Sequence, residues 1–538
     1  LGNKISAIME ALIFKFGHIL DSDYAINKMK ENLDIRFKLK GNNIAEKNKN
    51  AVDNAINTTH LLKIDENTDD YVEVSEVSSS LFDIIEKREG DTLPVSAFLD
   101  RPDGTVDGGL SRLEKRDISE VVPKKISENC ISCNLCSLVC PHAVIRPMLL
   151  DKEEVEKAPN SLNDKLLDSH LGDNLKFTIA VSYKDCTGCG LCANICPGKK
   201  GSKALEMVSK EKLVNDITLK ETEYLFNEVS EKDVICVSTV KGSQFKRPRF
   251  EFSGACAGCG ETPYLKLLTQ LFGDRLVIAN ATGCSSIYGA SSPSTPYSVP
   301  WANSLFEDNA EFGFGMKIAD EVKKQQLKNI INENISKVDE EEKDIYLDYV
   351  NDINVDTAKA LLSVIPHTKI KPLKSLKKYI MPISLWAVGG DGWAYDIGYN
   401  GIDHVLNSGE NVNILVLDTE VYSNTGGQAS KSSRAGAVAK FASNGKKTAR
   451  KDLLKIALTN PNVYVGAISL GANPASTVKV MLEAEKYNGP SIIVAYSPCI
   501  AWGILKGMSN SIDEEKKAML SGYFPIFHYN PDTKEFKM

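Results

Sequence analysis

Cysteine spacing constrains this chain more than any other feature of its sequence. Two groups of four share the pattern C-x2-C-x2-C-x3-C-P, and their members are Cys130, Cys133, Cys136, Cys140 and Cys186, Cys189, Cys192, Cys196. This spacing is typical of a pair of [4Fe–4S] clusters in which the fourth cysteine of each run ligates the other run's cluster. It predicts one cube on Cys130, Cys133, Cys136 and Cys196, and another on Cys186, Cys189, Cys192 and Cys140. The pattern therefore indicates a protein that transfers electrons.

Disulfides and zinc are the alternatives for so many cysteines. Disulfides require an oxidising compartment, and they would add little stability to a chain of 538 residues. Zinc sites use paired C-x2-C units, whereas each run here has three closely spaced cysteines and a fourth followed by proline. The arrangement is that of the bacterial ferredoxins.

Composition excludes some partners. The net charge of −7 argues against general nucleic-acid binding. No apolar run reaches the length of a membrane span, so we expect no membrane partner. We expect a cytoplasmic protein, and an organelle of an anaerobic eukaryote stays open because the chain begins at Leu1 and its true amino terminus is expected to be missing.

The chain divides into three regions by composition. Residues 1–94 combine amphipathic stretches at 5–20 and 24–39 with polar runs, and we interpret them as the end of an upstream domain plus a linker. Residues 95–215 form a ferredoxin-type α+β domain for the two clusters, in which the charged stretch 151–173 is expected to be a surface insertion. Residues 216–538 are expected to form an α/β domain with a mostly parallel sheet.

The third region contains short apolar runs rich in β-branched residues. They lie at 275–280, 382–388, 412–417, 463–468 and 491–495. Helical or glycine-rich segments separate them, as expected of a parallel sheet covered on both faces. The charged span 317–378 is expected to form surface helices. Ligands of such folds bind at the carboxyl ends of the strands.

Two of these strand ends carry groups suited to a diphosphate and a metal ion. The first is followed by Gly389-Gly390-Asp391-Gly392, and the second by residues 418–428, which read DTEVYSNTGGQ. Glycines let backbone amides approach a diphosphate, and a carboxylate supplies the hard oxygen that Mg²⁺ prefers. This is the layout of thiamine-diphosphate sites, although a G-D-G segment alone is also common in simple turns.

Longer strings show a resemblance to a known family. The chain resembles the single-chain pyruvate:ferredoxin (flavodoxin) oxidoreductases over nearly all residues from about 95 onward. The strings that carry the resemblance lie at 252–263, 279–286, 301–309, 389–398, 418–428 and 497–500.

The resemblance implies a third [4Fe–4S] cluster, bound by Cys256, Cys259, Cys284 and Cys499. From the residues alone, a C-x-x-C could equally be a redox pair or half of a zinc site, and isolated cysteines are usually core thiols. Cys236 is left over in an apolar run, and we expect it to pack in the interior.

The resemblance also implies the residues of the thiamine-diphosphate site. Asp391, the Thr419 side chain and the Val421 carbonyl would ligate Mg²⁺. Many thiamine enzymes have asparagine where this chain has Thr419, but a hydroxyl is also a hard oxygen. Gly390 and Gly392 would line the diphosphate, and Asn424 would lie over the cofactor as a catalytic residue.

The implied activity is the oxidative decarboxylation of pyruvate with coenzyme A to acetyl-coenzyme A and carbon dioxide. Electrons would pass through three clusters to ferredoxin or flavodoxin, in a homodimer when the protein is full length. The residues that bind the substrate carboxylate in this family belong to amino-terminal domains, so we expect this chain to be a fragment. A related 2-oxoacid oxidoreductase, a pyruvate:NADP oxidoreductase and a non-catalytic electron-transfer subunit stay open as alternatives.

Two local features bear on partners. The loop between Ala290 and Trp301 is shorter than the family's and lacks its Gly-Arg-Gly-Pro stretch, which puts substrate or coenzyme contacts there in question. Basic residues at 199–203 and 245–249 could dock an acidic ferredoxin, or could be ordinary solvated side chains.

Overall fold

The computed structural model describes residues 6–37, 42–59, 81–291 and 293–538. The chain separates into two compact units, 1–80 and 81–538. In the first unit, α1 (Ser6–Phe16), α2 (Ser22–Phe37) and α3 (Asn42–Thr58) pack around a small apolar core. The helices expected at 5–20 and 24–39 are therefore present, while much of the predicted linker lies outside the described residues.

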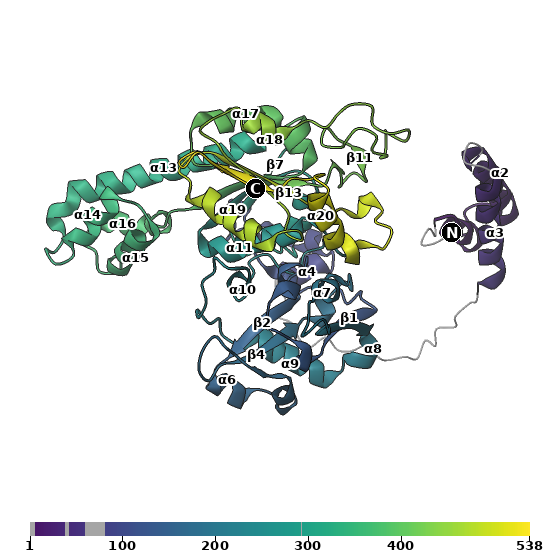
Figure 1. Cartoon of the computed structure of the whole chain (residues 1–538), viewed down its shortest axis with the longest axis horizontal. Helices are drawn as coiled ribbons and strands as arrows, with labels where there is room; N and C mark the ends of the chain where they lie inside the picture. The colour runs from purple at the N-terminus through teal and green to yellow at the C-terminus, as the bar shows by residue number, and fades with distance from the viewer. Residues whose placement is uncertain (1–5, 38–41, 60–80, 292) are drawn as a thin grey trace. The chain divides into compact units, whose positions relative to one another are not determined.

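The second unit is built on a large, mostly parallel sheet (Figure 1). In the described part of the chain it has eight strands, in the order β15-β14-β12-β13-β9-β8-β6-β7. All pairings from β12 to β7 are parallel, whereas β14 and β15 add an antiparallel hairpin at one edge. The strands are β6 (Leu276–Ala281), β7 (Trp301–Ser304), β8 (Ser384–Gly389), β9 (Asn413–Asp418), β12 (Tyr464–Ile468), β13 (Ser491–Tyr496), β14 (Phe527–Asn530) and β15 (Glu535–Lys537).

Helices cover both faces of this sheet, as the continuous apolar strands require. Side chains alternate along each strand, so Trp386 and Val388 of β8 meet α11 (Thr262–Phe272) and α19 (Pro474–Lys486) on one face. Leu385 and Ala387 meet α17 (Tyr399–Ser408) and α18 (Leu453–Ala457) on the other face. Figure 1 shows these two pairs of helices on opposite sides of the sheet. The predicted α/β fold class is confirmed.

The cysteine-rich domain has two small antiparallel sheets. In one, β1 (Val121–Lys125) pairs with β5 (Leu205–Ser209); in the other, β4 (Lys176–Val181) lies between β2 (Ile145–Leu150) and β3 (Leu167–Asp168). The short helices α5 (Leu135–Leu138) and α7 (Leu191–Ile195) carry the third cysteine of each run. Leu138, Val139 and Leu191 join the core that includes α11, so this domain packs on the α11 face of the large sheet.

The charged stretch between the two cysteine runs is more than the surface insertion expected from its composition. It contains α6 (Lys152–Lys157) and β3, and Leu162 within it is almost fully buried. Leu162 packs with Leu150 and with Leu225 of α9 (Asp216–Asn227). The insertion therefore builds its own small core beside the second sheet.

A helical lobe is inserted between β7 and β8. It consists of α13 (Asn309–Asn334), α14 (Lys343–Asn351), α15 (Val355–Val364) and α16 (Lys371–Ser375), and it extends to the left in Figure 1. Its core, which includes Leu327, Tyr346 and Tyr349, is separate from the cores of the sheet. The charged sequence of 317–378 is thus helical as predicted, with a buried side as well as a solvated one.

Short elements complete the described chain. They are α4 (Leu81–Glu86), α8 (Lys210–Leu213), α10 (Val240–Ser243), α12 (Cys284–Gly289), α20 (Ser511–Leu520), β10 (Val421–Tyr422) and β11 (Gln428–Ala429). Among the described helices, none has both the length and the apolar composition needed to cross a bilayer.

Candidate functional site

The first predicted cluster set lines a single cavity. Its walls contain Cys130, Cys133 and Cys136 of the first run and Cys196 of the second, together with Lys125 from β1. The amide of Ala204 donates to the sulfur of Cys196 over 3.3 Å. The structure therefore brings together the four cysteines that the crossed pattern assigned to one cube.

The second predicted set is also crossed. The Cys140 thiolate is one of the charges that raise the pKa values of Cys186, Cys189 and Cys192, so these sulfurs are electrostatic neighbours. Burial is the larger cause, and it raises the pKa of Cys186 to about 11 and that of Cys189 to about 12. Buried thiolates this close together need a cation to hold them in the ionised form.

The same backbone conformation recurs in both cysteine loops. Asn134 and Gly190 have φ angles of +63° and +82° and directly precede α5 and α7. Gly188 has a φ angle of +66°, and a Cβ there would lie 2.8 Å from the Val121 carbonyl oxygen. Its amide donates to the Cys186 sulfur over 3.4 Å. Left-handed backbone thus turns amides toward the sulfurs, an arrangement that tunes a cluster's potential.

Three of the four later cysteines lie near one buried glutamate. Glu261 is among the charges that raise the pKa values of Cys259, Cys284 and Cys499, in each case after burial. Cys256 acts in the same way on Cys259 and Cys499. Burial raises the pKa of Glu261 itself to about 7. These cysteines come from the loop before α11, the start of α12 and the loop after β13.

The described side chains do not form a site for a single metal ion made of three or more His, Cys, Asp or Glu residues. A [4Fe–4S] cube carries each thiolate on a different corner iron. Its ligands consequently stand further apart than the ligands of one ion.

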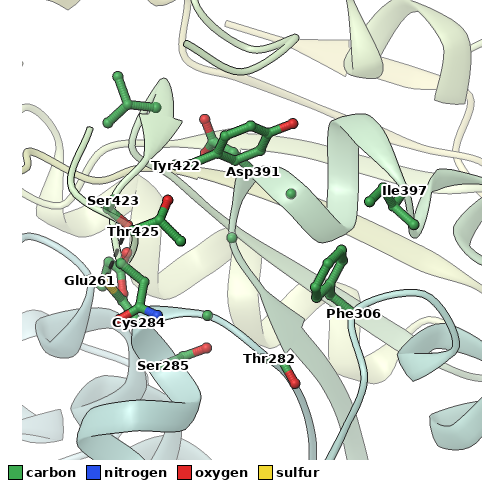
Figure 2. Close-up of a pocket in the computed structure, with 15 residues that line it drawn as sticks. Glu261, Thr282, Cys284, Ser285, Phe306, Asp391, Ile397, Tyr422, Ser423 and Thr425 are labelled. Atoms are coloured by element: carbon green, nitrogen blue, oxygen red, sulfur yellow. Dashed lines mark hydrogen bonds between the residues drawn. The ribbon is translucent and has the colours of Figure 1, made fainter. Parts of the chain in front are cut away.

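A cavity of about 300 Å³ lies where three neighbouring parallel strands end. Its walls come from the residues that follow β6, β8 and β9, which are adjacent in the sheet. Figure 2 shows Glu261, Cys284 and Ser423 together on one side, with Phe306 and Ile397 on the other. The lining includes Glu261, Thr282, Gly283, Cys284, Ser285, Phe306, Gly390, Asp391, Gly392, Ile397, Val421, Tyr422, Ser423, Asn424 and Thr425.

Two of the three predicted magnesium ligands, Asp391 and Val421, line this cavity, and Thr419 is hydrogen-bonded to both. One Asp391 oxygen accepts from the Thr419 amide over 3.1 Å, and the Thr419 hydroxyl donates to the Val421 carbonyl oxygen over 2.9 Å. Burial, and then the neighbouring Asp418 carboxylate, hold the pKa of Asp391 well above its usual range. A divalent cation would stabilise that carboxylate, and carboxylate, hydroxyl and carbonyl are the hard oxygens it takes. The residues therefore fit Mg²⁺.

Supporting contacts around these ligands were not predictable from the local sequence. The second Asp391 oxygen accepts from the Ser430 hydroxyl over 2.7 Å. Glu420 sits between Thr419 and Val421 with a φ angle of +59°, and its carboxylate accepts from Arg450 over 2.7 Å. These partners come from the loop after β11, so no spacing rule in the sequence identified them.

Gly390 and Gly392 both line the cavity, as expected, but neither is the glycine of this turn with the least space for a side chain. A Cβ at Gly390 or Gly392 would meet its nearest neighbour at 3.7 Å or 3.4 Å, whereas one at Gly389 would lie 2.6 Å from Trp393. The steric need for glycine is therefore strongest at Gly389. Asn424 is exposed and borders the cavity.

The apolar side of the cavity was not predicted as a site. Phe306 follows β7, and Ile397 lies just beyond the Gly389–Gly392 turn and is 57% exposed. Both fall within strings that carried the resemblance, but apolar residues there have no periodicity that separates a cavity wall from a core.

Cys236 does not pack in the interior, so that prediction is wrong. It is exposed, it lies outside any strand, and its sulfur is 2.8 Å from the Ser238 hydroxyl. The apolar run around it is only four residues long and is flanked by the polar residues Asp233 and Ser238.

Family models match both halves of the site. The 4Fe-4S dicluster domain matches residues 129–200, and the thiamine pyrophosphate enzyme C-terminal TPP-binding domain matches residues 381–495. A domain of unknown function, EKR, matches residues 70–119.

Curated relatives extend the likeness to 99% of the chain. A pyruvate:ferredoxin oxidoreductase of Moorella thermoacetica is 44% identical, and a pyruvate-flavodoxin oxidoreductase of Trichormus variabilis is 40% identical. This chain is a homologue of the pyruvate:ferredoxin and pyruvate-flavodoxin oxidoreductases. It spans about half of the length of these relatives, 48% and 47%.

Other relatives differ in the acceptor that their names state. A pyruvate dehydrogenase [NADP(+)] of Euglena gracilis is 40% identical, and the match covers 99% of this chain and 30% of that protein. Among solved structures, a 2-oxoglutarate:ferredoxin oxidoreductase from Magnetococcus marinus has a TM-score of 0.30 at 16% identity, covering 46% of this chain and 65% of that one. That structural likeness is too weak to carry an argument.

Proposed function

We propose that this chain forms the thiamine-diphosphate and iron–sulfur part of an enzyme that oxidises pyruvate with coenzyme A. The products are acetyl-coenzyme A and carbon dioxide, and the electrons pass to ferredoxin or flavodoxin. The proposal includes three [4Fe–4S] clusters, Mg²⁺ and a homodimer of the full-length protein. It also divides the chain at 95–215 for the cluster pair and 216–538 for the thiamine site and third cluster.

One contact carries this proposal more than any other. The Cys284 sulfur lies 3.2 Å from the Ser423 hydroxyl, and both residues line the cavity that adjoins Asp391. The third cysteine set and the thiamine cavity therefore share a wall. An electron-transfer subunit without catalysis leaves this shared wall and the buried Asp391 unexplained.

Each part of the cavity has a separate task in the proposed reaction. When bound, thiamine diphosphate supplies an electron sink for decarboxylation of a 2-oxoacid, and the clusters accept electrons singly. Asp391, Thr419 and Val421 would hold the magnesium ion of the diphosphate. Phe306 and Ile397 would form the apolar wall of the site, and the exposed Asn424 borders the cavity, where it would orient the substrate.

The proposed electron path runs between two adjoining cysteine loops. Burial raises the pKa of the Cys189 thiol, and the Gly258 amide, between Cys256 and Cys259, lies beside that thiol and acts in the opposite direction. This proximity supports an order in which the third cluster passes electrons to the cluster of Cys140, Cys186, Cys189 and Cys192. The cluster of Cys130, Cys133, Cys136 and Cys196 then faces the acceptor.

Metal and cofactor titrations on the anaerobically reconstituted chain test this proposal. Three clusters predict about twelve iron and twelve sulfide per chain, and two clusters predict about eight of each. Calorimetric titration with thiamine diphosphate and Mg²⁺ should show binding to the chain. A chain with about eight iron that does not bind thiamine diphosphate would favour the non-catalytic alternative.

A further inference from the structure

Lys266 is a fully buried lysine without an acidic partner. Its ammonium, on α11, donates to the carbonyls of Ser137, Leu138 (2.9 Å) and Cys140 (3.3 Å), which end α5 and continue into the fourth cysteine of the first run. Among the described residues, no carboxylate comes within ion-pair distance of this ammonium. Because an unpaired buried charge is strongly unfavourable, the site needs negative charge from another source.

The cysteines of the cluster pair provide that charge. Burial lowers the pKa of Lys266 to about 8, and the anionic groups that act against this, and so favour the charged ammonium, are Cys140 and after it Cys136. Arg146 is the other cation close to Lys266, and it already has an ion pair with the buried Glu251. Lys266 is therefore the cation in this region that has no carboxylate partner and can offset the negative charge of the cysteine thiolates.

Lys125 has the same relation to the first cavity. It lies on β1, lines the cavity with Cys130 and Cys136, and donates to the Lys165 carbonyl (2.9 Å) and the Thr178 hydroxyl (3.0 Å). In the described part of the chain it likewise has no carboxylate partner. Each crossed cysteine set thus has one lysine that pairs with no acidic side chain.

We propose that Lys266 and Lys125 are fixed counter-charges that raise the reduction potentials of the two clusters. Lys266 acts on the cluster of Cys140, Cys186, Cys189 and Cys192, and Lys125 acts on the cluster of Cys130, Cys133, Cys136 and Cys196. This inference rests on the proposed function, because it requires that both cysteine sets hold clusters.

The sign of the effect follows from the charge change on reduction. An electron passing from the third cluster to the cluster held beside Lys266 would reoxidise the first and reduce the second, with no proton moved. Reduction would add one negative charge there, and the Lys266 ammonium, in a low-dielectric interior, would stabilise it. Lys266 therefore makes this first step between clusters more favourable.

Lys324 provides a matched control in the helical lobe. Its ammonium also donates to three carbonyls, those of Tyr379, Ile380 (3.1 Å) and Met381 (2.7 Å), and in addition it lies 3.8 Å from the Asp320 carboxylate. The lobe, residues 309–381, contains no cysteine. Removing this ammonium therefore reproduces the loss of a carbonyl-capping lysine without a cluster beside it.

The test compares reduction potentials in the anaerobically reconstituted chain. Potentials are measured by titration monitored by electron paramagnetic resonance for Lys266→Met, Lys125→Met and Lys324→Met. We expect Lys266→Met to lower one cluster potential, Lys125→Met to lower a different one, and Lys324→Met to change none. Unchanged potentials in the first two variants would overturn the proposal.

Lys266→Gln separates charge from hydrogen bonding, because the amide still donates to the α5 carbonyls but carries no charge. We expect it to lower the same potential as Lys266→Met. A wild-type potential in Lys266→Gln, or loss of clusters in both variants, would assign Lys266 to holding α5 and overturn the counter-charge role. A wild-type chain that binds no iron would instead overturn the proposed function.

Discussion

Burial raises the pKa of the Cys189 thiol, and the backbone amide of Gly258, which lies beside that thiol, acts in the opposite direction. Gly258 belongs to the C-x-x-C of the third cysteine set, and Cys189 belongs to the second run, so two cysteine groups adjoin each other here. Gly258 has a φ angle of +80°, and a Cβ there would lie 2.5 Å from the Met508 Cβ. Both the turn and its close packing against Met508 require glycine at position 258, because glycine has no side chain.

Gly258→Ala should therefore destabilise the chain by more than its backbone strain alone. We expect about 1–2 kcal/mol from the left-handed backbone and about 1–3 kcal/mol from the contact with Met508. Gly201→Ala is the control, because Gly201 has a φ angle of +86° but no heavy atom near its Cβ position. Urea unfolding of the reconstituted protein measures the difference, and equal losses in the two variants would contradict the packing argument.

Asp391→Asn should weaken magnesium-dependent binding of thiamine diphosphate by at least about tenfold, because it replaces a buried carboxylate ligand with a neutral amide. Asp403→Asn, on the exposed side of α17, should leave binding unchanged. Calorimetric titrations in the presence and absence of Mg²⁺ provide the measurement. If the two variants bind equally well, Asp391 is not a ligand of the metal.

Cys499→Ser should remove one cluster and leave the other two in place. We expect the iron content to fall by about four per chain, because the third set would lose one of its four thiolates. Cys236→Ser should keep all the iron, since Cys236 is exposed and 2.8 Å from the Ser238 hydroxyl rather than near the other cysteines. Iron loss from both variants, or from neither, would show that the assignment of the third set is wrong.

Charge reversal at Lys199 and Lys200 should slow electron transfer to an acidic ferredoxin at low salt. Both lysines follow Pro197 and Gly198, which line the first cysteine cavity, so they lie beside the site of the cluster that we propose faces the acceptor. We expect roughly a tenfold lower rate, with the difference shrinking as ionic strength rises. Stopped-flow oxidation of the reduced chain measures this rate.

Lys246→Glu is the comparison for that experiment. Its ammonium already pairs with Glu231 at 2.8 Å and Asp233 at 3.4 Å, so little of its charge is free to attract a partner. We expect a smaller effect than for Lys199 and Lys200. A larger effect would move the docking surface to the second basic cluster.

Glu515 should make stability fall as pH rises toward neutrality. Burial raises its pKa to about 7, although the carboxylate accepts from the Ser469 hydroxyl and the Gly471 amide. The folded chain keeps the proton to a higher pH than the unfolded chain does. Its contribution to the free energy of unfolding is therefore complete below about pH 4.5, and roughly 3 kcal/mol is lost by about pH 7.

Glu515→Gln should remove this part of the pH dependence, because the amide does not ionise. Urea unfolding of both proteins at several pH values between 5 and 8 isolates the effect, since other titrating groups are common to the pair. Parallel stability curves for the two proteins would show that Glu515 does not carry the shift.

Local patterns predicted most of the fold. The apolar runs at 382–388 and 412–417 became β8 and β9, because continuous apolar strands have few alternatives to the centre of a parallel sheet. The charged insertion after Leu150 was harder to predict, because Leu162 is a single apolar residue that becomes buried through contacts with the distant α9. Cys236 was misplaced because a four-residue apolar run does not by itself show which side is covered.

The site was predictable where covalent chemistry sets the spacing. The crossed cysteine sets follow from sequence separation, and the turn at Asp391 follows from glycines beside a strand end. Ser430 and Arg450, which hold Asp391 and Glu420, were not predictable, because they reach the site from a loop without regular structure. The burial of Lys266 was also not predictable from the sequence, because a single lysine in an amphipathic helix normally points to solvent.

The crossing of the two cysteine runs has a consequence for biosynthesis. The first cavity needs Cys196, which leaves the ribosome after the whole insertion and the second run have been made. Until then, the three thiols of Cys130, Cys133 and Cys136 lack their fourth ligand and are exposed to oxygen and to other metal ions. A cluster held by this set could therefore be completed only after the second run has been synthesised.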